Sequence, residues 1–276
     1  MRGIAAALVL ALGLGLGLGA RVASAQDLSA APGAPPSAPI RADPDRPFLY
    51  LPDASPLAPG GVAFGYTVAV AQRGGAARPL PLTLRGATLL DTVALEVGLS
   101  ERLSVSVAGS VTSLSGGQEG RGRPQAQVQA SARLLLTDPR SAARVTLVGT
   151  AFRELAGDLG GALDAVASVE WGRVRLGASE HVERVFAPGR DPVDLYTVAG
   201  ASVRVSGPVR LGVEYVAEDV EELFDDEQAE GGLRHFVGAD AALTLARRWL
   251  LTFGPAFGLN AASPPFLGRA GLTYVF

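Results

Sequence analysis

Apolar and polar residues alternate with a period of two from Gly61 to the end of this chain. In the stretch 103–107, for example, Leu103, Val105 and Val107 alternate with two serines. Side chains of a β-strand point to opposite faces in turn, so this period predicts strands with one apolar and one polar face. Helices are the alternative for the alanine-rich runs, but their Ala and Leu recur at spacing two. No run after residue 25 reaches the ~18 apolar residues of a membrane helix.

The alternation predicts twelve strands, with ten or fourteen as the alternatives. They are expected at about 61–72, 89–99, 103–114, 125–136, 143–152, 162–171, 173–181, 193–205, 209–216, 233–245, 249–259 and 266–276. In the fifth and seventh of these, Val148 and Phe152 would point inward and Glu180 outward. This mismatch predicts a bulge or a register shift in both strands.

The connections between these strands alternate in length. Short turns are expected at 100–102, 137–142, about 172, 206–208 and 246–248, and longer segments at 73–88, 115–124, 153–161, 182–192, 217–232 and 260–265. A soluble sandwich would have to hide one apolar face of each sheet and gives no reason for this alternation. A membrane barrel has short periplasmic turns, longer outer loops and an apolar surface toward lipid. The sequence therefore predicts an all-β fold, a transmembrane antiparallel up-and-down β-barrel.

The last eleven residues, 266–276, form a strand whose apolar face ends in aromatic residues. Its members are Phe266, Gly268, Ala270, Leu272, Tyr274 and Phe276. With the hairpin at 97–105, this ending resembles the porin-like outer-membrane β-barrels of Gram-negative bacteria. In that class the terminal strand is read by the assembly machinery, which implies this role for Leu272, Tyr274 and Phe276. The resemblance also implies a place in the cell outer membrane, in contact with its lipid and lipopolysaccharide.

The first 60 residues precede the barrel. Residues 1–25 have a positive start at Arg2, an apolar run and a small-x-small site at 23–25, which predicts a secretory signal peptide. Residues 26–60 are rich in Pro, Ala and Ser, which predicts a flexible periplasmic linker. Its apolar patch, 48–51, could plug or brace the barrel or mark the approach to the first strand, and we expect the second.

Composition excludes several functions. The chain has 276 residues and no cysteine, which argues against a disulfide scaffold or a metal–thiolate site. Removing the signal peptide, with Arg2 and Arg21, takes the formal charge from −3 to −5. A mildly acidic chain is not expected to bind nucleic acid. No cofactor and no metal ion are expected.

Charged residues are predicted on the inner face of the barrel. The arginines lie close to short turns and therefore near the periplasmic mouth: Arg133, Arg144, Arg173, Arg175, Arg204 and Arg210. The acids are spread more widely in height: Glu96, Asp164, Glu170, Glu214 and Asp240. Together these eleven residues are predicted to line the pore. Two interpretations stay open, structural salt bridges in a narrow lumen and an electropositive constriction that favours anions.

No catalytic group stands out. Ser179, His181 and Glu183 share a face, but same-face neighbours on a strand are roughly 6–7 Å apart, too far for a direct hydrogen bond. His181 and His235 are therefore expected at the rim in water. The acidic segment 218–228 lacks the spacing of a calcium loop, so a solvated outer loop is expected, with loose binding of divalent cations as the alternative.

The sequence favours a porin-like barrel that allows passive passage of small solutes, with anions as the candidate class. The first alternative is a structural or adhesive barrel with a closed lumen and partner-binding outer loops. The second is a lipid-acting barrel enzyme, which we do not expect.

Overall fold

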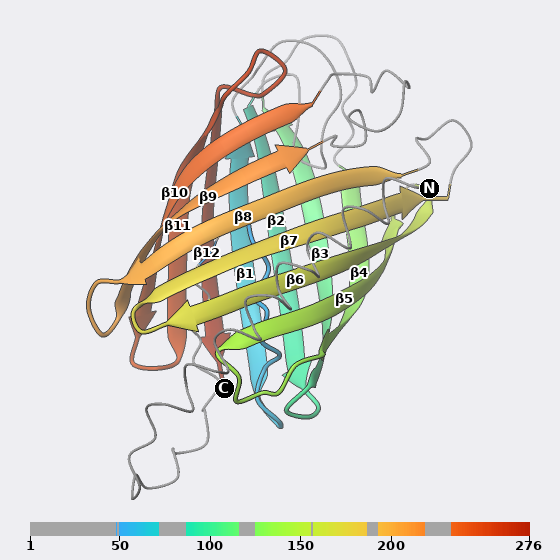
Figure 1. The fold of residues 1–276 in the computed structure, drawn as a ribbon. Helices are drawn as coiled ribbons and strands as arrows, with labels where there is room; N and C mark the ends of the chain where they lie inside the picture. The colour runs from blue at the N-terminus through green and yellow to red at the C-terminus, as the bar shows by residue number, and fades with distance from the viewer. Residues whose placement is uncertain are drawn as a thin grey trace, which may run out of the picture.

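The structure is a computed structural model that describes residues 48, 50–71, 87–115, 125–155, 157–186, 193–218 and 233–276. Twelve antiparallel strands form one closed barrel (Figure 1). They are β1 (Val62–Ala71), β2 (Ala87–Gly98), β3 (Leu103–Ser115), β4 (Gln125–Leu135), β5 (Ala143–Glu154), β6 (Leu159–Trp171), β7 (Val174–Val185), β8 (Asp194–Arg204), β9 (Val209–Glu218), β10 (Arg234–Leu245), β11 (Trp249–Gly258) and β12 (Phe266–Val275). The predicted fold class and the preferred strand number are both confirmed.

Each strand pairs with its neighbours in sequence, and β1 pairs with β12 to close the barrel. The closing register runs from Ala63 opposite Val275 to Ala71 opposite Leu267. Closure leaves no strand edge unpaired, so the aromatic ending of the chain is not an aggregation-prone edge.

The outer wall carries the apolar face that the alternation predicts. Large apolar side chains are exposed on the outside of most strands, among them Phe64, Leu95, Val107, Val213 and Phe253. A surface of this kind is stable only when something apolar covers it. Lipid provides that cover in a transmembrane barrel. In the described part of the chain, no helix is long and apolar enough to span a bilayer.

Two details of the predicted pattern are wrong. The ladders of β5 and β7 with their neighbours are continuous, with neither a bulge nor a shift. Val148 points inward without one because it packs in the lumen with Ala54 and Val166. Glu180 points outward, where the hydroxyl of Thr197 donates to its carboxylate at 2.6 Å.

The second wrong detail is the long loop expected at 153–161. β5 extends to Glu154 and β6 begins at Leu159, so only 155–158 connect them. The amide of Gly157 donates to the carbonyl of Glu154, and the amide of Glu154 to that of Asp158. Phe152 lies inside this end of the barrel over Gly160, whose missing side chain leaves room for the ring.

The C-terminal residues are tied to both neighbouring strands. The amide of Phe276 donates to the carbonyl of Val62 at 2.9 Å, and that of Val275 to the carbonyl of Arg248. The ring of Tyr274 lies between the rings of Trp249 and Phe276, with centroids 4.5 and 4.9 Å away. Phe276 itself is exposed on the outer wall.

Deleting Phe276 is expected to lower outer-membrane assembly in cells without preventing barrel formation in detergent. The deletion removes one terminal hydrogen bond and one exposed ring, whereas the β1–β12 register remains. Surface levels in cells and refolding yield in detergent would be measured together. Phe257→Ala is the control, because it also removes an exposed outer aromatic ring. Normal surface levels of the truncated chain would contradict the predicted assembly signal.

Candidate functional site: the barrel lumen

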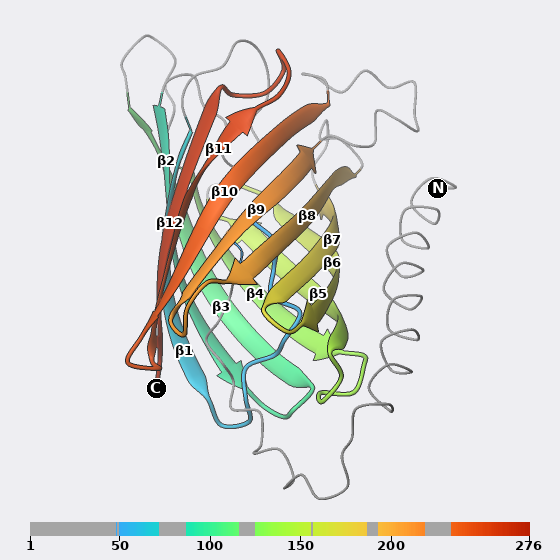
Figure 2. The same cartoon turned by 60° about the vertical axis from the view of Figure 1, so that its left-hand side comes forward.

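The lumen contains part of the chain itself. Residue 48 and residues 50–60, called here the luminal segment, run from the barrel interior to the mouth with the short turns, where Pro59 and Gly60 are exposed before β1 begins (Figure 2). The expectation that 48–51 only marks the approach to the first strand is therefore wrong, since this patch braces the inner wall. Phe48 and Leu51 pack against apolar side chains of the inner wall, whereas the side chains of a flexible linker would have no such partners.

One end of the luminal segment is fixed to the wall formed by β9 and β12. The carboxylate of Glu214 accepts hydrogen bonds from the amides of Tyr50 and Leu51, the latter at 2.8 Å. The guanidinium of Arg269 lies over the ring of Tyr50, 5.5 Å from its centroid. Burial raises the pKa of Tyr50 to about 12, so its hydroxyl stays neutral.

The other end is fixed to the opposite wall, formed by β4 and β5. Arg133 donates to the carbonyl of Ser55 and Arg144 to its hydroxyl, while Thr146 donates to the carbonyl of Ala54 at 2.6 Å. Contacts on both walls mean that the luminal segment crosses the lumen from side to side.

The inner wall is shaped to receive the luminal segment. A Cβ at Gly200 would lie 2.7 Å from the ring of Phe48, and one at Gly177 would lie 2.5 Å from Leu51. A Cβ at Gly98 would lie 2.0 Å from the carbonyl of Ala58. At Gly98 a Cβ would meet backbone, and at Gly177 and Gly200 it would force a packed side chain of the luminal segment to shift.

Apolar side chains of the wall complete the contact. Phe48 and Leu51 belong to one buried cluster with inward-facing residues of six strands: Ala71, Val198, Val216, Phe236, Ala256 and Leu267. Burial of apolar area is the main favourable contribution to such packing, at about 25 cal/mol per Å². The luminal segment is thus held by apolar contacts as well as by hydrogen bonds.

A polar cavity of about 360 Å³, called here the luminal cavity, lies beside the luminal segment. Residues 48 and 50–53 form one side of it, and the inner faces of the barrel strands form the others. Most of the wall groups are polar: Thr67, Glu96, Ser104, Ser106, Gln129, Ser131, Arg133, Thr150, Asp164, Thr252, Arg269 and Thr273. A space of this size and polarity can hold a small polar molecule.

The structure places the predicted pore-lining arginines near the ends of their strands that carry the short turns. Arg133 pairs with Glu96 at 3.1 Å, and Arg175 and Arg210 pair with the two oxygens of Glu170 at 2.8 and 3.1 Å. Arg144 contacts the luminal segment, and Arg204 donates to the carbonyl of Gly207. Arg173 was predicted on the inner face of a strand, but β7 begins at Val174 and Arg173 lies exposed in the preceding turn.

The remaining predicted acids lie deeper in the lumen. Glu214 holds the luminal segment, and Asp240 lies beside Gly212 with both carboxylate oxygens buried and without a partner among the described residues. Asp164 lies 2.6 Å from Nδ1 of His181. The structure therefore brings the arginines together at one end but divides the acids among separate contacts.

His181 is engaged on both ring nitrogens. Nδ1 faces Asp164, Nε2 lies 3.4 Å from Glu183, and the ring stacks on Tyr196 at 4.0 Å. A triad with Ser179 is therefore not assembled. His181 lies inside the barrel rather than at its rim, and His235 lies on the outer face against the Tyr215 hydroxyl.

Of the acidic segment 218–228, only Glu218 falls within the described residues. Among all the described residues, no group of three His, Asp or Glu side chains could hold a metal ion.

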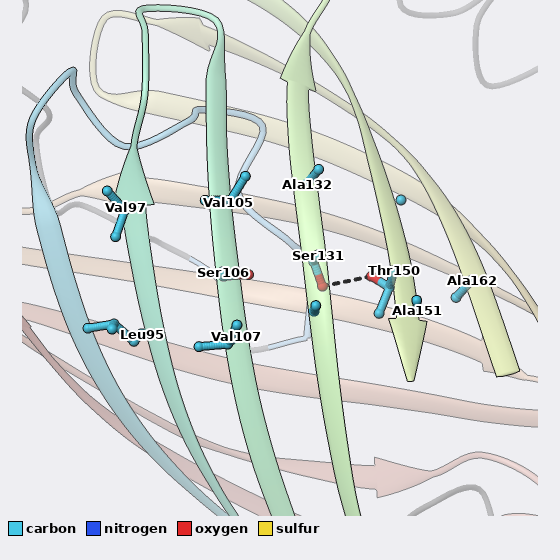
Figure 3. A pocket seen from close by; sticks show the side chains of 12 residues that line it. Leu95, Val97, Val105, Ser106, Val107, Ser131, Ala132, Thr150, Ala151 and Ala162 are labelled. Atoms are coloured by element: carbon cyan, nitrogen blue, oxygen red, sulfur yellow. Dashed lines mark hydrogen bonds between the residues drawn. The ribbon is translucent and has the colours of Figure 1, made fainter. Parts of the chain in front are cut away.

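A second hollow, of about 630 Å³, lies in the outer wall (Figure 3). Small outward residues of β4 and β5, such as Ala132, Gly149 and Ala151, form its floor, with larger ones such as Leu95 and Val107 at one side. The hydroxyls of Ser131 and Thr150 are bonded to each other at 2.9 Å behind it. Because this hollow lies on the lipid-facing surface, acyl chains would fill it.

Comparisons with known proteins agree with this architecture. No protein-family model matches the sequence, and no curated protein matches it significantly. Among solved structures, an outer membrane channel from Pseudomonas putida F1 aligns with a TM-score of 0.57 and 12% identity, over 81% of this chain and 98% of the channel. The KdgM porin in complex with disordered oligogalacturonate aligns with a TM-score of 0.52 and 6% identity, over 78% of this chain and 99% of the porin. The predicted class, an outer-membrane β-barrel of the porin-like type, is confirmed at the level of fold.

Proposed function

We propose that the protein is a porin-like channel of the outer membrane that passes small polar solutes passively. The observation that supports this most directly is the luminal cavity, a polar space enclosed by a closed barrel whose outer wall is apolar. The two structural neighbours, named as a channel and a porin, have the same architecture.

Single-channel recording in planar bilayers tests this proposal. Refolded mature protein is expected to give discrete current steps. Because the luminal segment crosses the lumen, these steps should be smaller than an unobstructed twelve-stranded barrel would give. Absence of steps over a wide range of salt and voltage would contradict passive passage.

A second candidate function is a structural or adhesive barrel with a closed lumen. The observation that favours it is the luminal segment itself, which contacts opposite walls. The same recordings separate the two functions. A closed barrel should stay silent, whereas a constricted channel should conduct.

An enzymatic role has less support. The ring nitrogens of His181 both face carboxylates, so this histidine is not available to activate Ser179. Hydrolysis of lipid or ester substrates by detergent-solubilised protein would be the direct contrary result.

If the barrel conducts, we expect it to prefer anions. On the inner face near the short turns, five arginines (Arg133, Arg144, Arg175, Arg204 and Arg210) accompany two glutamates (Glu96 and Glu170), which leaves this mouth positive. A positive ring raises the local concentration of anions, and salt screens it over ~10 Å at 0.1 M.

Reversal potentials in a salt gradient measure this preference. Arg204→Gln should shift the potential toward zero, since Arg204 lies at the mouth, where its guanidinium donates to the carbonyl of Gly207. Glu170→Gln is the control of opposite sign and should strengthen anion preference. Cation selectivity of the unmodified channel would show that the arginines are structural.

A further inference from the structure

We propose that the luminal cavity is a binding site for a neutral polyhydroxylated solute of about the size of one hexose. This inference names the solute class of the proposed channel and so rests on the proposed function. It follows from which polar groups of the cavity already have hydrogen-bond partners among the described residues and which have none there.

Most charged groups of the luminal cavity already have a polar or aromatic partner among the described residues. Glu96 is bonded to Arg133 and to the hydroxyl of Ser104. Asp164 is bonded to His181, and Asp53 accepts the amide of Ser55 at 3.0 Å. Arg269 lies against the ring of Tyr50, and Glu214 lies nearby. A charged ligand would have to disrupt these contacts, whereas a neutral one would not.

The uncharged polar groups of the luminal cavity come from two parts of the barrel wall. On one side, Thr67, Thr252 and Thr273 come from β1, β11 and β12. Gly271 lies among them, and a Cβ there would come within 2.8 Å of the Thr252 hydroxyl, so its absence keeps space open. On the other side, Ser106 and Gln129 come from β3 and β4. Hydroxyl and amide groups both donate and accept hydrogen bonds, as the hydroxyls of a sugar require.

Aromatic side chains of the luminal segment complete the site. Phe48 and Tyr50 line the same cavity and offer apolar ring surface to the C–H groups of a sugar ring. A space of about 360 Å³ is at the small end of the range of ligand pockets, which suits one sugar unit. Since the luminal segment forms one side of the cavity, the site exists only while that segment is in place.

Current block by a neutral sugar tests this inference. Glucose, added to conducting channels at increasing concentration, is expected to reduce the ion current in a saturable way. Glucuronate and glucosamine have similar size but carry charge, and both should block at higher concentration. Tighter block by either charged sugar would overturn the assignment of a neutral ligand.

Two hydroxyl deletions locate the site. The double variant Thr252→Val and Thr273→Val keeps the side-chain shape, removes two hydroxyls, and should raise the blocking concentration of glucose about tenfold, as loss of two hydrogen bonds implies. Thr244→Val is the matched control, because Thr244 lies on β10 but is not part of the cavity wall. Equal block in the double variant and the control would overturn the site.

Calorimetry in detergent separates failure of this inference from failure of the channel proposal. A barrel that never conducts but binds glucose, with the affinity lost in the double variant, supports the site and contradicts the channel. A barrel that conducts but shows neither block nor calorimetric binding of glucose supports the channel and overturns the site.

Discussion

Gly200→Val is expected to displace the luminal segment and to raise the single-channel conductance several-fold. The added side chain would begin 2.7 Å from the Phe48 ring and 3.4 Å from the Glu214 side chain. The Phe48 ring lies in the packed apolar cluster and would have to shift, and overpacking of this kind costs about 1–3 kcal/mol. The amides of Tyr50 and Leu51 donate hydrogen bonds to the neighbouring Glu214. The same substitution therefore disturbs both the packing of Phe48 and the hydrogen bonds to Glu214.

The control for this substitution is Gly149→Val. Gly149 lies on β5, and a Cβ there meets nothing within 4 Å. The control should therefore leave the conductance unchanged although it carries the same change of residue type. Equal conductance of both variants and the unmodified protein would contradict an obstructing luminal segment.

An engineered disulfide between the luminal segment and the wall gives an independent test of whether the segment obstructs the lumen. The chain contains no cysteine of its own, so only the engineered pair can form a disulfide. Leu51→Cys with Gly177→Cys places one thiol on the luminal segment and one on the wall that it touches. Leu51→Cys removes most of the apolar side chain that packs in the buried cluster, so the luminal segment should be looser in the reduced state. Oxidation should then hold it in place and lower the conductance, and reduction should restore the higher value.

The fold could be predicted because its signal is repeated along the chain. Each strand repeats an alternation such as that of Leu103, Val105 and Val107, and a lipid-facing wall requires this pattern in every strand. Single departures from the pattern were harder to interpret. Val148 is apolar but inward because it meets Ala54 of the luminal segment, a contact between residues 94 positions apart that no local period reveals.

The content of the lumen could be predicted only in part. The alternation of faces along a strand predicts that these arginines point inward, and their position in the sequence predicts that they lie near short turns. Their ion-pair partners depend on the register between strands, as for Arg210 and Glu170. The luminal segment was missed because a Pro- and Ala-rich composition outweighed its apolar patch. A signal was present in the inward glycines at 177 and 200, which leave the inner wall without side chains opposite that patch.

Val107→Arg is the second substitution with a large expected effect, here on membrane insertion. Val107 is 56% exposed on the outer wall of β3, between Leu95 of β2 and Ala130 of β4 in the register of the sheet. An arginine on the lipid face costs about 2–4 kcal/mol at the bilayer midplane, because its charge loses water without gaining a partner. Folding yield and urea stability in lipid vesicles should both fall.

Ser106→Arg is the matched control, because it places the same side chain one residue away but on the opposite face of β3. Ser106 lines the luminal cavity and lies opposite Glu96 in the register, so the new guanidinium would meet water and a carboxylate rather than lipid. Its folding cost in vesicles should be clearly smaller than that of Val107→Arg. In detergent micelles, where the guanidinium can reach water more easily, the difference between the two variants should narrow. Equal losses in vesicles would mean that the two faces of β3 have the same surroundings, which a barrel with a lipid-facing wall and a hydrated lumen does not allow.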